Sequence, residues 1–153
     1  MRKNQILSFF VGGGSYVALE LLWRGRSHSS MFVAGGCCFL LLGQLKTRLK
    51  NSPLLLRGMA GAAAITAVEL ATGFLCNRNY KVWDYRNTPL NFKGQICLPY
   101  FLLWIPLSLV GMELFSALQR RISGVQDREL PKEREEDKIC AIVVPTHKKG
   151  CII

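Results

Sequence analysis

Two acidic residues, Glu20 and Glu69, lie inside runs of apolar residues. An ionisable side chain in a membrane helix costs about 2.5–3.5 kcal/mol at the helix centre and less near the interface, so each carboxylate needs a partner. Arg24 follows Glu20 at the i,i+4 spacing of a helical ion pair. Glu69 has no basic residue within a helical turn, and its candidate partners are Arg24, Arg26 and His28. A clamp between two helices is the favoured explanation for Glu20. For Glu69, a clamp and a substrate, ion or proton site explain the sequence equally well.

The stretch NYKVWDYRNTPLNFKGQICLP (79–99) places polar and aromatic residues between two apolar runs. Asp84 is the only acidic residue of the basic loop 77–94, where it can accept backbone donors in a turn or pair with Arg86 or Lys93. Three side-chain amides accompany it: Asn77, Asn91 and Gln95. We interpret this stretch as a cover over one end of a helix bundle that forms part of a site.

Aromatic residues and a histidine flank these polar groups. Trp23, Trp83, Tyr85 and Tyr100 lie where membrane proteins carry an aromatic belt, which is the default explanation for them. His28 directly precedes an apolar segment, where a helix cap is a more common role than a proton carrier. The candidate residues of a substrate or ion site are Glu20, Arg24, His28, Glu69, Asn77, Asp84, Asn91 and Gln95, with Trp23, Trp83 and Tyr85 beside them.

Known catalytic motifs are absent from the sequence. It contains no HExxH, GxSxG or GxxxxGK[ST] pattern and no paired-carboxylate motif. Its six cysteines have neither CxxC nor histidine-paired metal spacing, and the sequence does not fix whether Cys76 and Cys97 pair. We therefore expect no metal site, no cofactor and no enzyme activity, and in particular no ATP hydrolysis by this chain.

Four apolar runs must position the candidate residues, and these are 5–23, 30–45, 54–76 and 95–118. A helix needs roughly 20 residues to cross a bilayer, and only 30–45 is clearly short. The first 118 residues contain four acidic residues against twelve Lys and Arg, whereas a soluble domain would carry many more acids. The sequence predicts an all-α polytopic membrane protein, a bundle of four transmembrane helices with a long ordered loop between helices 3 and 4.

The chain divides into a membrane domain and a tail. Residues 1–118 are expected to form the four-helix transmembrane domain. Residues 119–153 contain six acidic and eight basic residues, including the run RELPKEREEDK. Because such a mixed charged run is usually solvated, we expect a disordered tail.

The topology brings the candidate residues together. With four spans, the ends of the first and third helices meet the starts of the second and fourth on one side of the membrane. Glu113 belongs to the opposite side, where Arg120 and Arg121 could pair with it. Lys and Arg near the membrane number seven on the side of the termini and six on the other, and the near part of the tail adds more. The positive-inside rule then favours cytoplasmic termini.

Several motifs of the chain resemble one family. They are ELLWRGRSHSSMF (20–32), GGCCFLLLG (35–43), VEL (68–70) with the following Gly73 and Asn77, and VWDYRNTPLNFKGQICLPYFLLW (82–104). They resemble the ABC-transporter type IV, or CmpB-like, family of small bacterial integral membrane proteins. The similarity covers roughly residues 5–118 and leaves the tail uncovered.

The resemblance implies a permease-like subunit in a bacterial cell membrane, working with a separate ATP-binding subunit. It carries over two blocks of residues without assigning a catalytic role to any of them. The first contains Glu20, Trp23, Arg24, Gly25, Ser27, His28 and Met31. The second contains Glu69, Gly73, Asn77, Trp83, Asp84, Tyr85, Pro89, Asn91, Gly94, Gln95, Cys97 and Pro99.

The favoured function is therefore a transport or permease component. One four-helix chain offers little room for a pore, so we expect a homo-oligomer or a complex in the lipid bilayer and no nucleic-acid partner. An integral membrane enzyme acting on lipid head groups is one alternative, and it predicts turnover without any ATPase. A structural or regulatory membrane partner is another, with the tail as its docking segment.

Overall fold

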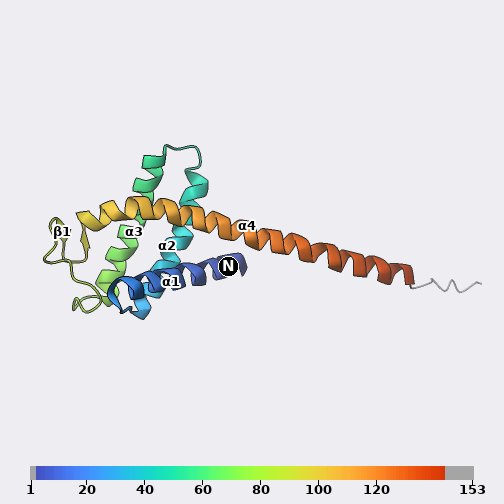
Figure 1. The fold of residues 1–153 in the computed structure, drawn as a ribbon, viewed down its shortest axis with the longest axis horizontal. Coiled ribbons are helices and arrows are strands. Elements are labelled where there is room, and N and C mark those ends of the chain that lie inside the picture. Colours follow the sequence, from blue (N-terminus) through green and yellow to red (C-terminus); the bar gives the residue numbers. More distant parts are fainter. Residues whose placement is uncertain (1–2, 144–153) are drawn as a thin grey trace, which may run out of the picture. The chain divides into compact units, whose positions relative to one another are not determined.

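The computed structural model describes residues 3–143, with side chains from residue 4 to residue 124. The last ten residues of the predicted tail lie outside this range. Two compact units are distinguished, 1–118 and 119–153. Within residues 3–143 the elements are the helices α1 (Lys3–Arg24), α2 (Ser29–Arg48), α3 (Leu54–Cys76) and α4 (Leu98–Val143), with the strands β1 (Asn91–Phe92) and β2 (Ile96–Cys97) before α4 (Figure 1).

Each of the four helices contains a segment that is long and apolar enough to cross a membrane. These segments are Asn4–Arg24, Ser29–Arg48, Leu54–Cys76 and Leu98–Gly124. The predicted helical membrane protein is confirmed. The helix α4 begins three residues later than predicted, so Gln95 belongs to the loop and Pro99 occupies the first helical turn. Proline suits this position because its missing N–H would have no intrahelical acceptor there.

Glycines bring α1 and α2 into close contact. A Cβ at Gly12 would collide with Phe39, and a Cβ at Gly35 would collide with Tyr16. Without water to drive association, membrane helices pack through such small residues, which let the backbones approach. Gly25, at φ +66°, ends α1 in the left-handed conformation and donates its N–H to the Leu21 carbonyl, 2.9 Å away.

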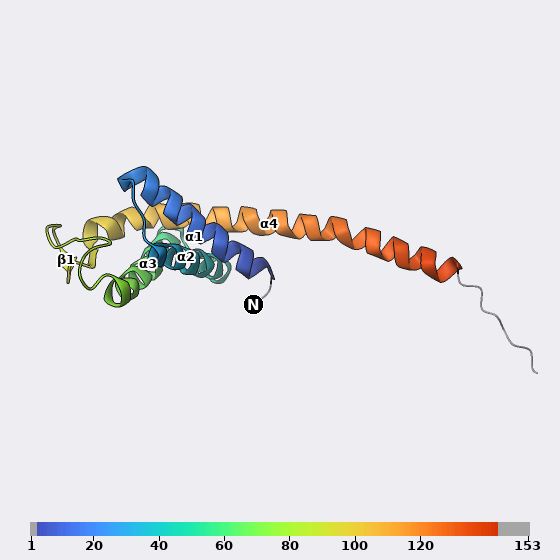
Figure 2. The ribbon, with the colours of Figure 1, turned by 90° about the horizontal axis from the view of Figure 1, so that it is seen from below.

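A small apolar core joins the other three helices. Leu42 of α2, Ile65 of α3 and Met112 of α4 are buried together. Ser108 of α4 donates a hydrogen bond of 3.1 Å to the Gly58 carbonyl of α3. Both ribbon views show α2 and α3 as a hairpin, with α1 and the first part of α4 running across it (Figure 1, Figure 2).

Ion pairs connect three helices at the end of the unit away from the β-strands. The Nζ atom of Lys46 lies 2.6 Å from Oε2 of Glu113, and Nη2 of Arg57 lies 3.9 Å from Oε1 of the same residue. Glu113 therefore has partners from α2 and α3, which the sequence did not suggest. The side chain of Glu113 is 67% exposed, so these ion pairs lie at the surface.

The helix α4 extends well past the predicted span and ends at Val143. Its residues 119–143 belong to the second unit. Most helical stability in proteins comes from packing an amphipathic face rather than from intrinsic propensity. The disorder of the tail and its cytoplasmic location therefore both stay predictions.

Candidate functional site at the loop face

The carboxylate of Glu69 in α3 is buried, with only 7% of the residue exposed. Its Oε1 accepts a hydrogen bond of 2.9 Å from the Tyr85 hydroxyl, and its Oε2 accepts one of 3.3 Å from Nε1 of Trp104. Among the described residues, Glu69 forms no ion pair. The cations proposed from the sequence are therefore not its direct partners, and two neutral donors hold the carboxylate instead.

Aromatic rings from three elements surround this carboxylate. Tyr85 of the loop stacks on Tyr100 of α4, with ring centroids 4.7 Å apart. Tyr16 of α1 lies 6.4 Å from Trp104 of α4, measured between ring centroids. Burial, and then the negative charge of Glu69, raises the pKa of Tyr85 above its ordinary value. Tyr85 therefore remains a hydrogen-bond donor over the physiological pH range.

Glu20 is equally buried but is held differently. Arg24 pairs with its Oε1, and the Ser27 hydroxyl donates to its Oε2 over 2.6 Å. Arg24 also donates from Nη1 to the Val82 carbonyl in the loop, 2.9 Å away. Glu20 thus ties the end of α1 to the loop through Arg24, whereas the clamp expected from the sequence holds the first and third helices together and stays a prediction.

The two carboxylates belong to separate hydrogen-bond networks. The loop reaches both of them, through Val82 near Glu20 and through Tyr85 at Glu69. The predicted convergence of helix ends on one face therefore agrees with these contacts. Among the described residues, no hydrogen bond or ion pair joins Glu20 to Glu69, and each carboxylate has its own donors.

Asn77 and Gln95 fasten the loop to the end of α3. Asn77 is 1% exposed and Gln95 3% exposed. The Asn77 amide donates to the Trp83 carbonyl (2.6 Å) and to Oε1 of Gln95 (3.1 Å), and its Oδ1 accepts from the Val82 N–H (2.9 Å). Gln95 returns a hydrogen bond of 3.1 Å from Nε2 to the Asn77 carbonyl. Because these polar atoms satisfy one another, we assign both amides a structural role.

The two tryptophans of the predicted aromatic belt differ in exposure. Trp23 is 84% exposed, as expected for a ring facing lipid or the interface. Trp83 is only 5% exposed, and its Nε1 donates to the Gln95 carbonyl over 2.9 Å. The ring of Trp83 is therefore buried by the rest of the loop and does not belong to an aromatic belt at the membrane interface.

The tip of the loop is a hydrogen-bonded turn that contains Asp84 and Asn91. Arg86 donates to both carboxylate oxygens of Asp84, at 2.9 and 2.7 Å, and these bonds lower the pKa of that exposed carboxyl. Asn91 donates to the carbonyls of Arg86 and Thr88 and accepts from the Gly94 N–H. These contacts are internal to the turn, so neither residue extends the Glu69 site.

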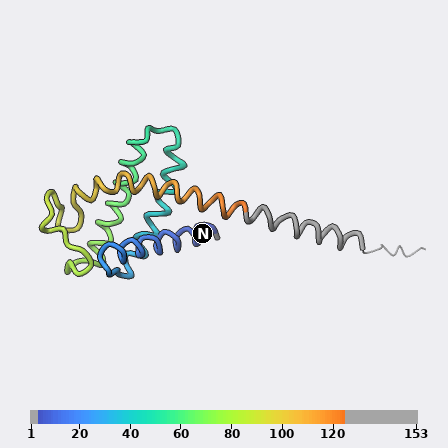
Figure 3. Tube along the Cα trace, in the orientation of Figure 1, coloured from blue at the N-terminus to red at the C-terminus, as the bar shows by residue number. Residues whose placement is uncertain are grey.

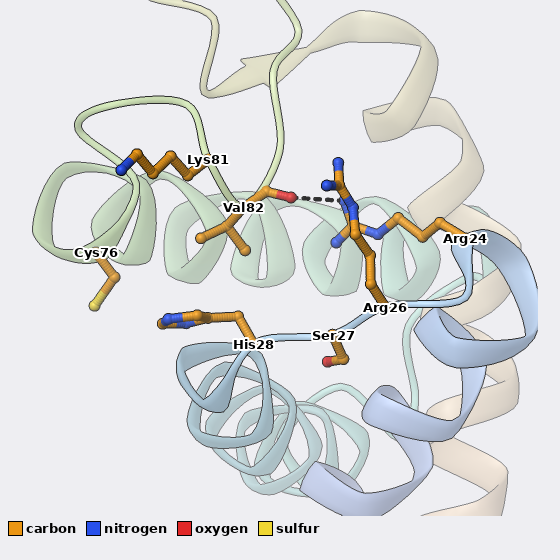
Figure 4. Close-up of a pocket in the computed structure, with 7 residues that line it drawn as sticks. All are labelled: Arg24, Arg26, Ser27, His28, Cys76, Lys81 and Val82. Atoms are coloured by element: carbon orange, nitrogen blue, oxygen red, sulfur yellow. Dashed lines mark hydrogen bonds between the residues drawn. The ribbon is translucent and has the colours of Figure 1, made fainter.

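His28 caps α2 and lies beside a surface hollow of about 270 Å³ (Figure 4). Its Nδ1 accepts from the Ser30 N–H, 3.2 Å away, which agrees with the cap role expected for it. The hollow is lined by Arg24, Arg26, Ser27, His28, Cys76, Lys81 and Val82. Cys76 and Cys97 are both free thiols.

Of the two donors to Glu69, Trp104 is the one that is absent from the candidate residues predicted from the sequence. An indole N–H that is removed from water needs an acceptor, and Trp104 lies well inside an apolar segment. This was the one available signal that Trp104 would pair with an acid in another helix. No group of three or more metal-ligating side chains occurs within the described part of the chain.

Comparison with known proteins gives one match. A family model described as "Putative ABC-transporter type IV" matches residues 24–132, which is more than half of the chain. The matched range includes Glu69 and the whole loop, whereas Glu20 lies just before it. It also extends to residue 132, so the expectation that the family similarity ends at residue 118 is wrong. Searches for similar curated proteins and for similar solved structures found no match. The family resemblance noted from the motifs is confirmed, and the chain belongs to the ABC-transporter type IV family.

Proposed function

We propose that this chain is a permease-like membrane subunit of an ABC-type transporter in the cell membrane. Family membership and the four membrane-spanning helices support this assignment. Because the chain has no GxxxxGK[ST] motif, ATP hydrolysis requires a separate ATP-binding subunit. The termini lie in the cytoplasm, and further membrane subunits, such as copies of this chain, complete the pathway.

The observation that carries the proposal is the environment of Glu69. Acidic residues inside membrane segments commonly mark substrate, ion or proton pathways. A buried carboxylate with a purely structural role would be expected to pair with a cation, as Glu20 does with Arg24 of the same helix. Glu69 instead accepts hydrogen bonds from Tyr85 and Trp104, so its negative charge is not neutralised by a contacting cation. This favours a site for a positively charged group or a proton.

A catalytic role in lipid head-group chemistry receives less support. Such an enzyme would use Glu69, His28 and Asp84 together. His28 accepts the helix-capping hydrogen bond, and Asp84 is paired with Arg86 at the loop tip. We therefore propose that the chain is not an enzyme, and we expect the purified protein alone to turn over no phospholipid.

Purification of the tagged chain in mild detergent from its native cells tests the proposal. We expect an ATP-binding subunit with a nucleotide motif to co-purify and to hydrolyse ATP. A chain ending at Leu118 serves as a matched variant. Equal co-purification with both chains indicates that the helical domain makes the contact, and loss of the partner with the shorter chain indicates docking through the tail. Recovery of the full chain without any ATP-binding protein contradicts the proposal.

A further inference from the structure

The surface hollow beside α2 is separate from the Glu69 site in its lining and in its chemistry. It lies where α1 ends, where α2 begins and where the loop leaves α3 (Figure 4). Its lining residues come from the end of α1, the connection before α2, the end of α3 and the loop that follows α3. All of these parts meet at the loop ends of the membrane segments. The hollow is therefore at the level of the membrane–water interface.

Positive charge dominates this hollow. Three of its seven lining residues are Arg24, Arg26 and Lys81, and no acidic residue lines it. Glu20 neutralises Arg24 from behind through its ion pair. Among the described residues, neither Arg26 nor Lys81 forms an ion pair. Two positively charged residues thus line the hollow, and neither has an acidic partner among the described residues.

The remaining lining groups suit a phosphate oxygen better than a large organic ligand. The His28 ring accepts at Nδ1 and so carries its proton on Nε2, which adds a donor to the cationic groups, whereas the Ser27 hydroxyl is already donated to Glu20. A volume of about 270 Å³ lies just below the roughly 300–1,000 Å³ of pockets for drug-sized ligands. Guanidinium groups match the geometry of phosphate oxygens and bind them through charge-assisted hydrogen bonds.

We propose that this hollow binds a phosphate group at the membrane face, with Arg26 and Lys81 as its main charge partners. Two sources present this chemistry at that level, namely the head group of an anionic phospholipid and a soluble phosphate. Basic pockets between membrane helices bind phospholipid head groups in this way. The site does not depend on the transport function proposed for Glu69.

Binding of defined probes to the purified full chain tests the site. The chain is delipidated in detergent, and its thermal unfolding is measured with added phosphatidylglycerol, phosphatidylcholine or inorganic phosphate. The double variant Arg26→Gln/Lys81→Gln removes the two charges without touching the Glu20–Arg24 pair. A matched control, Arg78→Gln/Lys93→Gln, removes two charges from the same face outside the hollow.

We expect phosphatidylglycerol or inorganic phosphate to raise the unfolding temperature of the wild type and of the control. Each basic group near an anionic membrane contributes about fivefold in affinity, so the Arg26/Lys81 variant should bind about thirtyfold more weakly. A shift with phosphatidylglycerol but not with phosphate identifies the lipid as the source, and the reverse identifies a soluble phosphate. A wild type that responds to neither probe, or two double variants that respond equally, would overturn the proposal.

Discussion

At the scale of single residues, Glu20 and Glu69 are two buried carboxylates with different partners. Glu20 is paired with Arg24 and also accepts from Ser27, which fits a structural contact. Glu69 accepts from Tyr85 and Trp104, two neutral donors that belong to the loop and to α4. The difference matters because a carboxylate without a bonded cation keeps its charge available for a ligand or a proton.

The hydrogen bond from Tyr85 to Glu69 predicts a loss of stability at alkaline pH. Burial and the Glu69 charge raise the pKa of Tyr85 above its ordinary value of 10.0. A group whose pKa is raised by folding stabilises the fold fully below its unfolded pKa, and this contribution is lost as the pH rises through the folded value. We expect the contribution of Tyr85 to stay constant from neutral pH to pH 10.0 and to fall above it.

Thermal unfolding in detergent, followed by circular dichroism from neutral to strongly alkaline pH, measures this effect. The control is Tyr85→Phe, which removes the hydroxyl and keeps the ring. At neutral pH it should be less stable by about 1.5–3 kcal/mol, the range for a hydrogen bond to a charged group. Identical pH profiles for the wild type and the variant would contradict the assignment.

The residue-scale contacts could be predicted from the sequence only where they are local. The pair of Glu20 and Arg24 follows from helical spacing, and the cap formed by His28 follows from its place before α2. The bond between Glu69 and Trp104 spans 35 residues and depends on how α3 and α4 pack. No periodicity in the sequence encodes that distance.

At the scale of elements, the loop between α3 and α4, whose course Figure 3 traces, is attached to the helices by a few specific contacts. Asn77 caps the end of α3 and bonds to both Trp83 and Gln95. Tyr85 extends the attachment to Glu69, and its N–H donates to the Gly94 carbonyl over 3.0 Å. The position of the loop therefore sets the donors of the candidate site.

Gly73→Ala tests this attachment at its tightest point. A Cβ at residue 73 would collide with the side chain of Gln95, and Gln95 cannot retreat without breaking its bonds to Asn77. We expect the variant to be destabilised by about 1–3 kcal/mol, as for overpacking of a well-filled interior. Faster cleavage of the loop by added protease in detergent would accompany this loss.

Gly14→Ala is the matched control for that substitution. A Cβ at Gly14 of α1 meets no atom within 4 Å. Because alanine is the better helix former by about 0.8–1.0 kcal/mol, this variant should be unchanged or more stable. If both alanine variants were equally stable and equally resistant to protease, the close contact between Gly73 and Gln95 would be wrong.

Helix positions were largely predictable from the sequence, because apolar run length reflects the thickness of the bilayer. The start of α4 was less predictable, since Ile96 and Cys97 continue the apolar run of the helix towards the N-terminus but belong to β2. The belt assigned to Trp83 failed for a related reason. A tryptophan at the membrane interface and a buried tryptophan can both occur next to an apolar segment of the sequence. Only the hydrogen bond from Trp83 to the Gln95 carbonyl shows that Trp83 is of the buried kind.

At the scale of the whole chain, the membrane domain has two different faces. The loop face holds Glu69, the Glu20–Arg24 pair and the basic hollow, whereas the opposite face holds the exposed Glu113 with Lys46 and Arg57. This asymmetry supplies a matched pair of acidic residues, one buried at the candidate site and one exposed away from it.

The central claim is that Glu69 serves function rather than folding, and its most direct test is ATP hydrolysis by the complex of this chain with the ATP-binding subunit that we propose for it. Glu69→Gln is compared with Glu113→Gln, both of which remove a charge while keeping the side-chain size. Removing a buried charge relieves a desolvation cost, so the Glu69 variant should still fold and assemble. We expect Glu69→Gln to lose most of the hydrolysis while it still folds and assembles, and Glu113→Gln to retain it. Full activity of the Glu69 variant, or loss of its folded protein, would contradict the account.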